Sequence, residues 1–309
     1  MTKSFFLYLS RSPRVQARVM SLPLARRAAR RFVVGERLDE AIEAVREMNQ
    51  EKMLASLDHL GENVMTPKGA RGSTEEALGI LDAIERNGVQ SNLSVKLTQL
   101  GLRVDESLCR ENLRAILERA AARRNFVRID MEGSDVTEVT LQMFENLHDR
   151  YPNVGVVVQA YLRRTESDLT DRLIPRGASI RLCKGAYREP PGVAFPEKRD
   201  VDANYRRLAD LLLSAKTRGL GVRTAVATHD EAIIGYVLEK VKTEGLGKAD
   251  FEFQMLYGIR RDLQRRLAAE GFVVRIYVSY GKEWYPYFMR RLAERPANVF
   301  FLIRNIVRG

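Results

Sequence analysis

The feature that most constrains the fold is a regular alternation between short runs rich in β-branched residues and longer helical patterns. The runs at residues 91–97, 125–131, 154–160, 178–184, 222–228, 250–255 and 272–278 predict strands. A weaker candidate at residues 57–64 brings the expected number to eight. Repeated strand–helix units form a parallel sheet, and eight such units can close into a barrel. We therefore predict an α/β fold of the (βα)8 barrel type.

A doubly wound open sheet is the alternative fold, but no glycine-rich dinucleotide-binding turn supports it. The one similar stretch, residues 219–224, leads into a strand rather than into a helix. Residues 36–57 have the periodicity of an amphipathic helix. The sequence thus predicts two parts, namely a basic N-terminal arm with helices at residues 1–57 and the barrel at residues 58–309.

The charge and the cysteine content leave several locations and binding partners open. The chain of 309 residues has a net charge of +11, and no acidic residue precedes Glu36. Such a basic leader fits a solvated arm, a contact with anionic lipid, or an organelle-targeting segment, and these alternatives stay open. The two cysteines, Cys109 and Cys183, favour a reducing compartment over a disulfide framework. No apolar run has the length of a membrane-spanning helix.

Polar side chains recur where the predicted strands end. They are Lys96, Asp130, Glu132, Gln159, Arg181, Lys184, Thr228, His229 and Gln254. In a closed parallel barrel the loops that follow the carboxyl ends of the strands form the active face. A recurrence on six consecutive strands is difficult to attribute to solvation alone, so we interpret it as the lining of an active site.

Several of these residues allow more than one interpretation. Asp130 and Glu132 could form a paired-carboxylate acid–base site, or either could be the counter-ion of Arg128 or Lys96. A lone histidine such as His229 is more often a hydrogen-bonded structural residue than a base. The histidines and cysteines lack metal-ligand spacing, and the chain has neither a Walker phosphate loop nor a GxSxG nucleophile turn.

The final predicted helix contains two adjacent arginines within the stretch WYPYFMRRLAER. Helical offsets of three and four place Tyr287, Arg290 or Arg291, and Glu294 along one side. Two guanidinium groups near a barrel mouth can bind a small carboxylate through charge-assisted hydrogen bonds, with Glu294 orienting one arginine. With Tyr277 as an aromatic wall, the expected ligand is a small anion that has an apolar body.

Several stretches together resemble the proline dehydrogenase family in its short bacterial monofunctional form. They are RIDMEGSD, VVVQAYLRRT, RLCKGAYREP, ATHD, FEFQMLYG and YPYFMRRLAER, and the resemblance extends from about residue 58 to residue 304. It implies a distorted (βα)8 barrel, FAD as cofactor, and oxidation of L-proline to Δ1-pyrroline-5-carboxylate, the first step of proline catabolism. It also implies hydride transfer from proline C5 to flavin N5, and electron transfer onward to a membrane quinone.

The resemblance also assigns roles to residues. Asp130 and Arg181 would be catalytic. Substrate would be bound by Lys96, Leu182, Tyr187, Tyr277, Tyr287, Arg290, Arg291 and Glu294. The cofactor would be bound by Met131, Gln159, Arg181, Lys184, Gly185, Ala186, Thr228, His229, Asp230 and Gln254, and no metal is expected. Two positions depart from the family: Asp230 replaces the usual asparagine and adds negative charge near the adenine side of the cofactor, and Ser279 replaces a common proline.

From the resemblance we expect a cytoplasmic enzyme that does not bind nucleic acid. Peripheral contact with the inner face of the cytoplasmic membrane stays open. Two rival functions remain at this point. One is a barrel enzyme that acts on a phosphorylated small molecule, with Arg181 and Lys184 as phosphate ligands. The other is a basic nucleic-acid-binding protein, whose affinity would depend strongly on salt.

Overall fold

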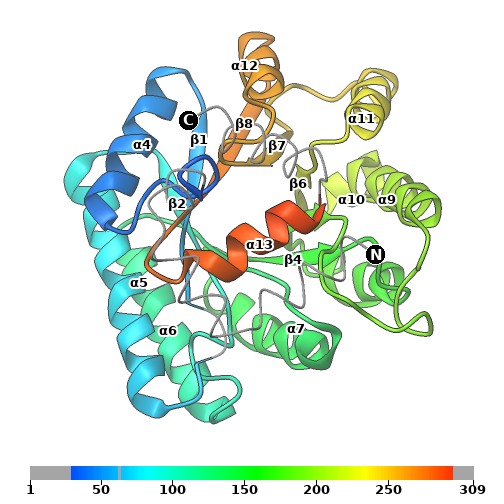
Figure 1. Cartoon of the computed structure of the whole chain (residues 1–309). Helices are drawn as coiled ribbons and strands as arrows, with labels where there is room; N and C mark the ends of the chain where they lie inside the picture. The colour runs from blue at the N-terminus through cyan, green and yellow to red at the C-terminus, as the bar shows by residue number, and fades with distance from the viewer. Residues whose placement is uncertain (1–28, 62–63, 295–309) are drawn as a thin grey trace.

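The strands form a closed parallel barrel in the computed structural model, which describes residues 29–61 and 64–294, the last three by backbone alone (Figure 1). They are β1 (Leu54–His59), β2 (Ser91–Val95), β3 (Val127–Ile129), β4 (Val154–Gln159), β5 (Ser179–Cys183), β6 (Arg223–Ala227), β7 (Phe251–Leu256) and β8 (Val273–Tyr280). Each strand pairs with the next along the chain, and β1 pairs with β8 to close the barrel. The predicted (βα)8 barrel is confirmed, and the open doubly wound sheet is wrong.

Most of the helices surround the barrel, while the last described helix lies across its mouth (Figure 1). The helices are α4 (Leu38–Gln50), α5 (Pro67–Asn87), α6 (Glu106–Ala122), α7 (Ser134–His148), α8 (Thr165–Ser167), the π-helical turn η1 (Asp168–Leu173), α9 (Lys198–Leu213), α10 (Ala215–Gly219), α11 (Glu231–Thr243), α12 (Arg261–Ala269) and α13 (Trp284–Glu294). Local sequence explains several of their ends. In α5, Thr66 accepts a hydrogen bond from Gly69 N at 3.1 Å, and Gly88 ends the helix with a φ of 61°.

Strand β1 begins earlier than the sequence pattern predicts. The expected strand at residues 57–64 and the expected helix at residues 36–57 are both displaced, because α4 ends at Gln50 and β1 then occupies residues 54–59. Apolar Ala55 and Leu57 alternate with polar Ser56 and Asp58 in this strand, and all four are buried. Ser56 and Asp58 hydrogen-bond to side chains inside the barrel, so the polar face of the strand is buried rather than solvated. The predicted boundary between residues 57 and 58 lies inside β1, and the two-part division stays a prediction.

The interior of the barrel contains charged side chains on the amino-terminal side of the predicted site. Arg128 Nη1 donates to the backbone oxygen of Ser179 at 2.6 Å, and Arg275 Nε donates to Glu252 Oε1 at 3.0 Å. A β-carbon on Gly155 would lie 2.4 Å from Arg128 Nη1, so glycine leaves room for the guanidinium. Burial, and then repulsion by the arginine of β5, lowers the pKa of Arg128 to about 9.

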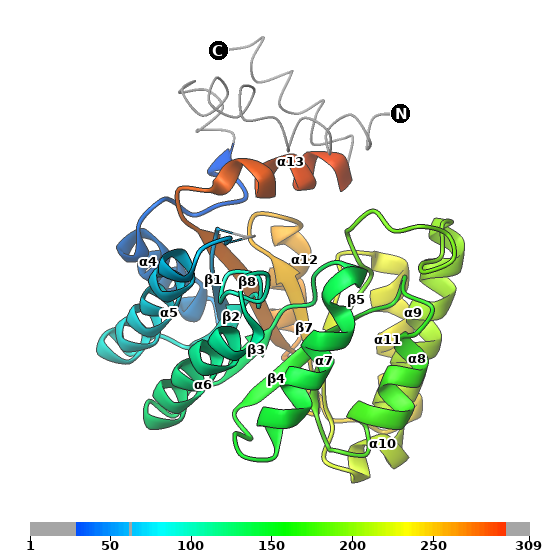
Figure 2. The ribbon, with the colours of Figure 1, turned by 90° about the horizontal axis from the view of Figure 1, so that it is seen from below.

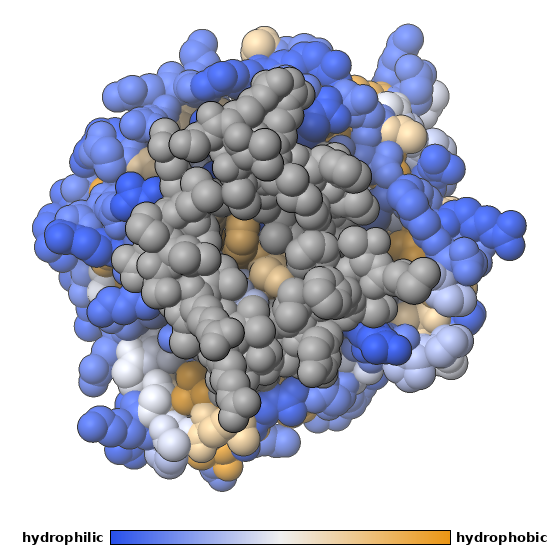
Figure 3. Space-filling view, in the orientation of Figure 1, coloured by the Kyte–Doolittle hydropathy of each residue, from blue (hydrophilic) through white to orange (hydrophobic). Residues whose placement is uncertain are grey.

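Helix α13 crosses the mouth of the barrel at the carboxyl ends of the strands (Figure 2). Its aromatic residues Trp284, Tyr285 and Phe288 form an apolar cluster with Phe32 and Leu60, which come from the N-terminal segment and from the loop after β1. The outer rim of this face is mostly hydrophilic, with some apolar residues at its lower edge in the view (Figure 3). Among the helices of the described residues, none combines the length and apolar character that crossing a bilayer requires.

Candidate active site

A buried ion-pair cluster lies at the carboxyl ends of β1, β2, β3 and β8. The ammonium of Lys96 is 2.7 Å from Asp58 Oδ1 and 3.2 Å from Asp130 Oδ2. It also donates to the hydroxyl of Tyr277 at 3.1 Å. Lys96, Asp58 and Asp130 are each less than a tenth exposed. Because a buried charge is costly without a partner, these contacts fix the position of the lysine.

Arg181 extends the cluster across the barrel from β5. Its Nη1 lies 2.8 Å from Asp130 Oδ1, its Nε donates to Gln254 Oε1, and its Nη2 donates to Ser94 Oγ at 3.3 Å. Its guanidinium carbon is 5.2 Å from the centre of the Tyr277 ring. The two cations and two carboxylates of the cluster balance, so its formal charge is zero.

Tyr277 stays protonated in this environment. Burial raises its pKa well above the ordinary value, and the carboxylates of Asp130 and Asp58 raise it further. The hydroxyl of Tyr277 donates a hydrogen bond to Asp130 Oδ2, and the hydroxyl oxygen accepts one from Lys96 Nζ. The tyrosine therefore helps to fix the geometry of both charged groups.

The two carboxylates that follow β3 have different surroundings. Glu132 accepts hydrogen bonds from Thr98 N at 3.1 Å and from Thr98 Oγ1 at 2.6 Å, whereas Asp130 contacts the cations. This arrangement favours the interpretation of Asp130 as a counter-ion of Lys96 over a paired-carboxylate site. The described hydrogen bonds of Arg128 go to backbone oxygens and to Ser179, so Arg128 is not the partner.

His229 has the structural role that a lone histidine usually has. Its Nε2 accepts a hydrogen bond from the backbone N–H of Leu256 at 2.8 Å, which connects the end of β6 to β7. Because Nε2 accepts here, the ring proton belongs on Nδ1 when the imidazole is neutral. The neighbouring Thr228 is buried, and its Oγ1 accepts from Asp230 N at 3.1 Å.

Lys184 and Asp230 belong to a second charged group, at the loops after β5 and β6. Lys184 Nζ contacts Asp202 of α9 and lies 2.7 Å from Asp230 Oδ2, while Lys198 Nζ is 3.3 Å from that same oxygen. Burial alone raises the pKa of Asp230, but Lys184 and Lys198 outweigh it and lower the pKa to about 2. The negative charge that the sequence introduces at Asp230 is thus balanced by lysines.

The loop after β5 turns sharply at Gly185, whose φ is 102°. A β-carbon there would lie 2.1 Å from the ring of Tyr161, so only glycine fits. Ala186 and Tyr187 follow and are half-buried, and Tyr187 packs against the apolar cluster that contains Tyr161. Leu182 lies on the opposite face of β5 from Arg181 and belongs to the core, which does not support the predicted substrate contact.

Helix α13 places its two arginines differently. Arg291 is 8% exposed, and its guanidinium carbon is 5.0 Å from the centre of the Tyr287 ring, one helical turn away. Arg290 is half-buried. The backbone of Glu294 ends the helix, but its side chain lies outside the described residues. The predicted stripe on α13 is therefore present for Tyr287 and Arg291, and neither arginine is fully exposed.

Some residues of the site are absent from the sequence predictions. Asp58 pairs with Lys96, and Ser279, the position where proline was expected, donates to Asp58 Oδ2 at 3.3 Å. Asp202 pairs with Lys184. A signal for Asp58 existed, because the pattern Ser-x-Asp in β1 parallels Ser-x-Lys after β2, but the displaced strand boundary obscured it.

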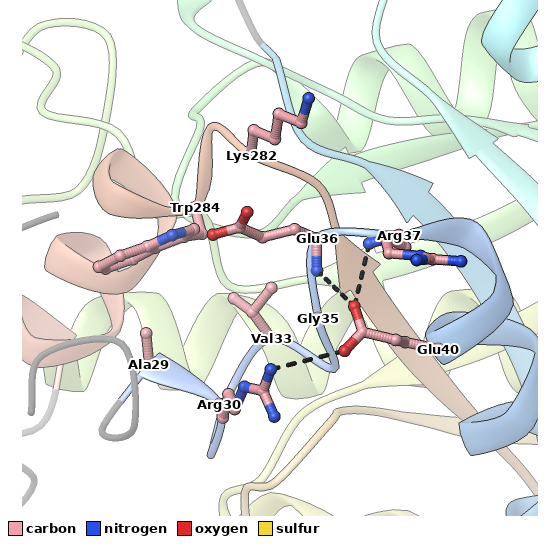
Figure 4. Close-up of a pocket in the computed structure, with 9 residues that line it drawn as sticks. All are labelled: Ala29, Arg30, Val33, Gly35, Glu36, Arg37, Glu40, Lys282 and Trp284. Atoms are coloured by element: carbon pink, nitrogen blue, oxygen red, sulfur yellow. Dashed lines mark hydrogen bonds and ion pairs between the residues drawn. The ribbon is translucent and has the colours of Figure 1, made fainter. Parts of the chain in front are cut away.

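A separate hollow of about 470 Å³ lies beside the start of α13, with Trp284 and Arg30 in its walls (Figure 4). Glu40, at one side, accepts from Glu36 N at 3.0 Å and pairs with the largely exposed Arg30. None of the predicted site residues lines this hollow. Glu40 here bonds to Arg30 and to the backbone at the start of α4, so the buried cluster inside the barrel is the stronger candidate site.

Comparison with known proteins gives a consistent match. The family described as proline dehydrogenase matches residues 41–304 of the chain. Proline dehydrogenase 2 of Bacillus subtilis (strain 168) is 39% identical over 307 residues, 99% of each chain. Proline dehydrogenase of Deinococcus radiodurans is 42% identical over 288 residues, 91% of this chain and 90% of the relative. Proline utilization A from Bdellovibrio bacteriovorus, solved after inactivation by N-propargylglycine, superposes with a TM-score of 0.81 at 26% identity, covering 87% of this chain and 33% of that longer one.

Proposed function

Since this chain belongs to the proline dehydrogenase family and is an oxidoreductase, we propose that it oxidises L-proline to Δ1-pyrroline-5-carboxylate with FAD and passes the electrons to a membrane quinone. The observation that carries this proposal is the buried, neutral cluster of Lys96, Asp58, Asp130, Arg181 and Tyr277 beneath a helix with two arginines. A neutral cluster does not itself attract an anion, so the added positive charge of α13 would select a carboxylate.

In this proposal the proline carboxylate is bound by Arg290 and Arg291. Stacking on Tyr287 orients the Arg291 guanidinium, and Glu294 would orient one arginine of the pair. The ring of the substrate would lie against Tyr187 and Tyr277. Because α13 is held by an apolar aromatic cluster, the arginines are pre-positioned, which lowers the entropic cost of binding.

The residues at the ends of β4 and β5 fit a flavin. Gln159 donates to the backbone oxygens of Met131 and Glu132, each at 3.3 Å, and its buried Oε1 has no hydrogen-bond partner among the described residues. A buried acceptor without a donor is costly, and the ring N–H of an isoalloxazine is a suitable donor. Arg181, Lys184, Gly185, Ala186, Thr228, His229, Asp230 and Gln254 would complete the cofactor shell.

Hydride acceptance from proline C5 at flavin N5 is the chemistry that the bound cofactor would supply. The protein residues would act around that step. Asp130 holds Arg181, Lys96 and Tyr277 through three contacts, so its role is to keep the polar wall of the site in one arrangement. Arg181 would stabilise negative charge that develops on the acceptor. The tightly bonded cluster would need little reorganisation as that charge appears.

The quinone acceptor implies contact with a membrane surface, because quinones dissolve in lipid. We therefore include in the proposal a cytoplasmic enzyme that associates peripherally with the inner face of the membrane. The basic composition of the leader supports this, since no acidic residue precedes Glu36. Most of that leader, residues 1–28, lies outside the described residues.

The alternative of a phosphorylated substrate is disfavoured by the charges of its expected ligands. Arg181 is already paired with Asp130, and Lys184 is paired with both Asp202 and Asp230. A phosphate would have to displace carboxylates that hydrogen-bond directly to these cations. The alternative of a nucleic-acid-binding protein draws no support from the fold or from the relatives.

The test of the proposed function is the spectrum of the purified protein. We expect a flavin absorbance at about 450 nm that bleaches when L-proline is added without oxygen and returns when a quinone is supplied. Bleaching with D-proline, which presents the ring in the mirror arrangement, should be much slower. A protein without flavin, or a flavin that L-proline does not reduce, would overturn the proposal.

A further inference from the structure

Glu189 connects two loops of the active face that are separated by strand β4. Its Oε1 accepts a hydrogen bond from the backbone N–H of Ser134 at 2.8 Å, and its Oε2 accepts from the hydroxyl of Ser134. Ser134 is the first residue of α7, in the loop region that follows Asp130. Glu189 itself lies in the loop after β5, two residues beyond Tyr187.

Local sequence explains why the N-terminus of α7 is capped by a carboxylate from another loop. The residue at the N-cap position of α7 is Gly133, which has no side chain. The N-cap residue therefore provides no capping hydrogen bond to the helix. The first N–H groups of a helix need acceptors, and its N-terminus favours negative charge. Glu189 supplies both requirements from across the fold. The clasp between Glu189 and Ser134 is therefore more than a surface contact, because it satisfies a backbone donor that is otherwise without an intrahelical partner.

Tyr187 itself packs against the cluster that contains Tyr161, and the loop has further described contacts on either side of it. At its beginning, Lys184 is paired with two aspartates. At its end, Phe195 N donates to the backbone oxygen of Tyr161 at 2.8 Å, and a β-bridge joins Ala194 to the segment after β4. Between these anchors, the clasp joins the segment that contains Tyr187 to the start of α7.

We infer that Glu189 is a positioning residue for substrate binding, which sets the place of Tyr187 against the proline ring by fastening its loop to α7. This rests on the proposed function. It predicts that Glu189 affects binding of the substrate more than the chemical step, because the wall contact is made alike in the bound substrate and in the transition state.

The test compares Glu189→Gln with Glu197→Gln in the flavin-loaded enzyme. Both changes remove one negative charge from the same loop region, but Glu197 is exposed and makes no side-chain capping bond to its helix, α9. We expect Glu189→Gln to raise the KM for L-proline about 10-fold with kcat within about 2-fold, as for loss of one charge-assisted hydrogen bond. The control variant should keep the KM of the unmodified enzyme, and the flavin content of both should be unchanged.

The route through Tyr187 is tested by a double-mutant cycle. In a Tyr187→Ala background, Glu189→Gln should have no further effect on KM. Equal KM values for Glu189→Gln and the control, or additive effects of Glu189→Gln and Tyr187→Ala, would overturn the inference. The proposed function would still stand if L-proline reduces the flavin of these variants. Loss of flavin or unfolding in Glu189→Gln would identify a general structural role and also overturn it. Ser134→Ala, which removes only the hydroxyl donor, should give a smaller rise in KM, and no rise would contradict the clasp.

Discussion

Replacing Asp130 with asparagine tests the ion-pair cluster because the change keeps the shape of the side chain and removes its charge. Asp130 has contacts with Arg181 at 2.8 Å, with Lys96 at 3.2 Å, and with the hydroxyl of Tyr277. The formal charge of the cluster would rise from zero to +1. Lys96 keeps Asp58 as a partner, but Arg181, which is 5% exposed, loses its only carboxylate contact among the described ion pairs.

The size of the effect follows from this geometry. Removing one partner of a buried ion pair costs about 3–5 kcal/mol, since it leaves the other charge without compensation. The asparagine oxygen can still accept one hydrogen bond, and Gln254 still accepts from Arg181, so we expect about 3 kcal/mol of lost unfolding free energy. For a chain of this size that corresponds to a fall in Tm of about 5 °C.

The assay is calorimetric unfolding at neutral pH, with Asp149→Asn as the control. Asp149 follows α7 on the exposed surface, and its replacement should change stability by less than about 0.5 kcal/mol. Two outcomes would refute the reasoning. One is an Asp130→Asn protein as stable as the control variant, and the other is an equal loss in both.

Two further predictions concern the cofactor side. Asp230→Asn removes a carboxylate whose pKa is lowered to about 2 by Lys184, against the effect of burial, so the variant should be less stable at neutral pH. A carboxylate whose pKa is lower in the folded protein than the unfolded value of 3.8 stabilises the fold at pH values above 3.8. The difference in urea midpoint between the unmodified protein and Asp230→Asn should therefore shrink as the pH falls from 3.8 toward 2. A difference that does not change with pH would contradict this prediction. Gly185→Ala would place a β-carbon 2.1 Å from the ring of Tyr161 at a φ of 102°, so we expect low flavin content in the purified protein, and normal flavin content would refute the close approach.

The sequence allowed the barrel to be predicted because strand and helix periodicities alternate along most of the chain. It failed at β1, where Ala55 and Leu57 alternate with Ser56 and Asp58 over only a few residues, and where the polar residues face the buried interior instead of solvent. The rule that buried faces are apolar does not hold inside this barrel, which also encloses Arg128 and Glu252. The same exception that hid the strand also hid Asp58, the partner of Lys96.

The candidate site was predictable as a set of strand ends but not as a set of contacts. Tyr277 and Asp130 are 147 residues apart in the chain, and Lys96 and Tyr277 are 181 residues apart. Which carboxylate balances which cation depends on side-chain length and strand register in the closed barrel, and spacing along the chain contains neither. Glu189 had no signal at all, because its partners are the backbone N–H and the hydroxyl of Ser134, a residue 55 positions away in the chain.

The central claim is that the arginines of α13 bind the carboxylate of proline over the polar cluster of the barrel. The most direct measurement is anaerobic flavin reduction by L-proline and by L-prolinamide, in the unmodified enzyme and in Arg290→Met. Two charge-assisted bonds correspond to about 3 kcal/mol or more, so the unmodified enzyme should prefer proline over the amide by at least about 100-fold in the ratio of the reduction rate constant to Kd. In Arg290→Met the preference should shrink greatly, through a higher Kd for proline, while flavin stays bound. Equal reduction by both compounds, or an unchanged preference in Arg290→Met, would contradict the claim.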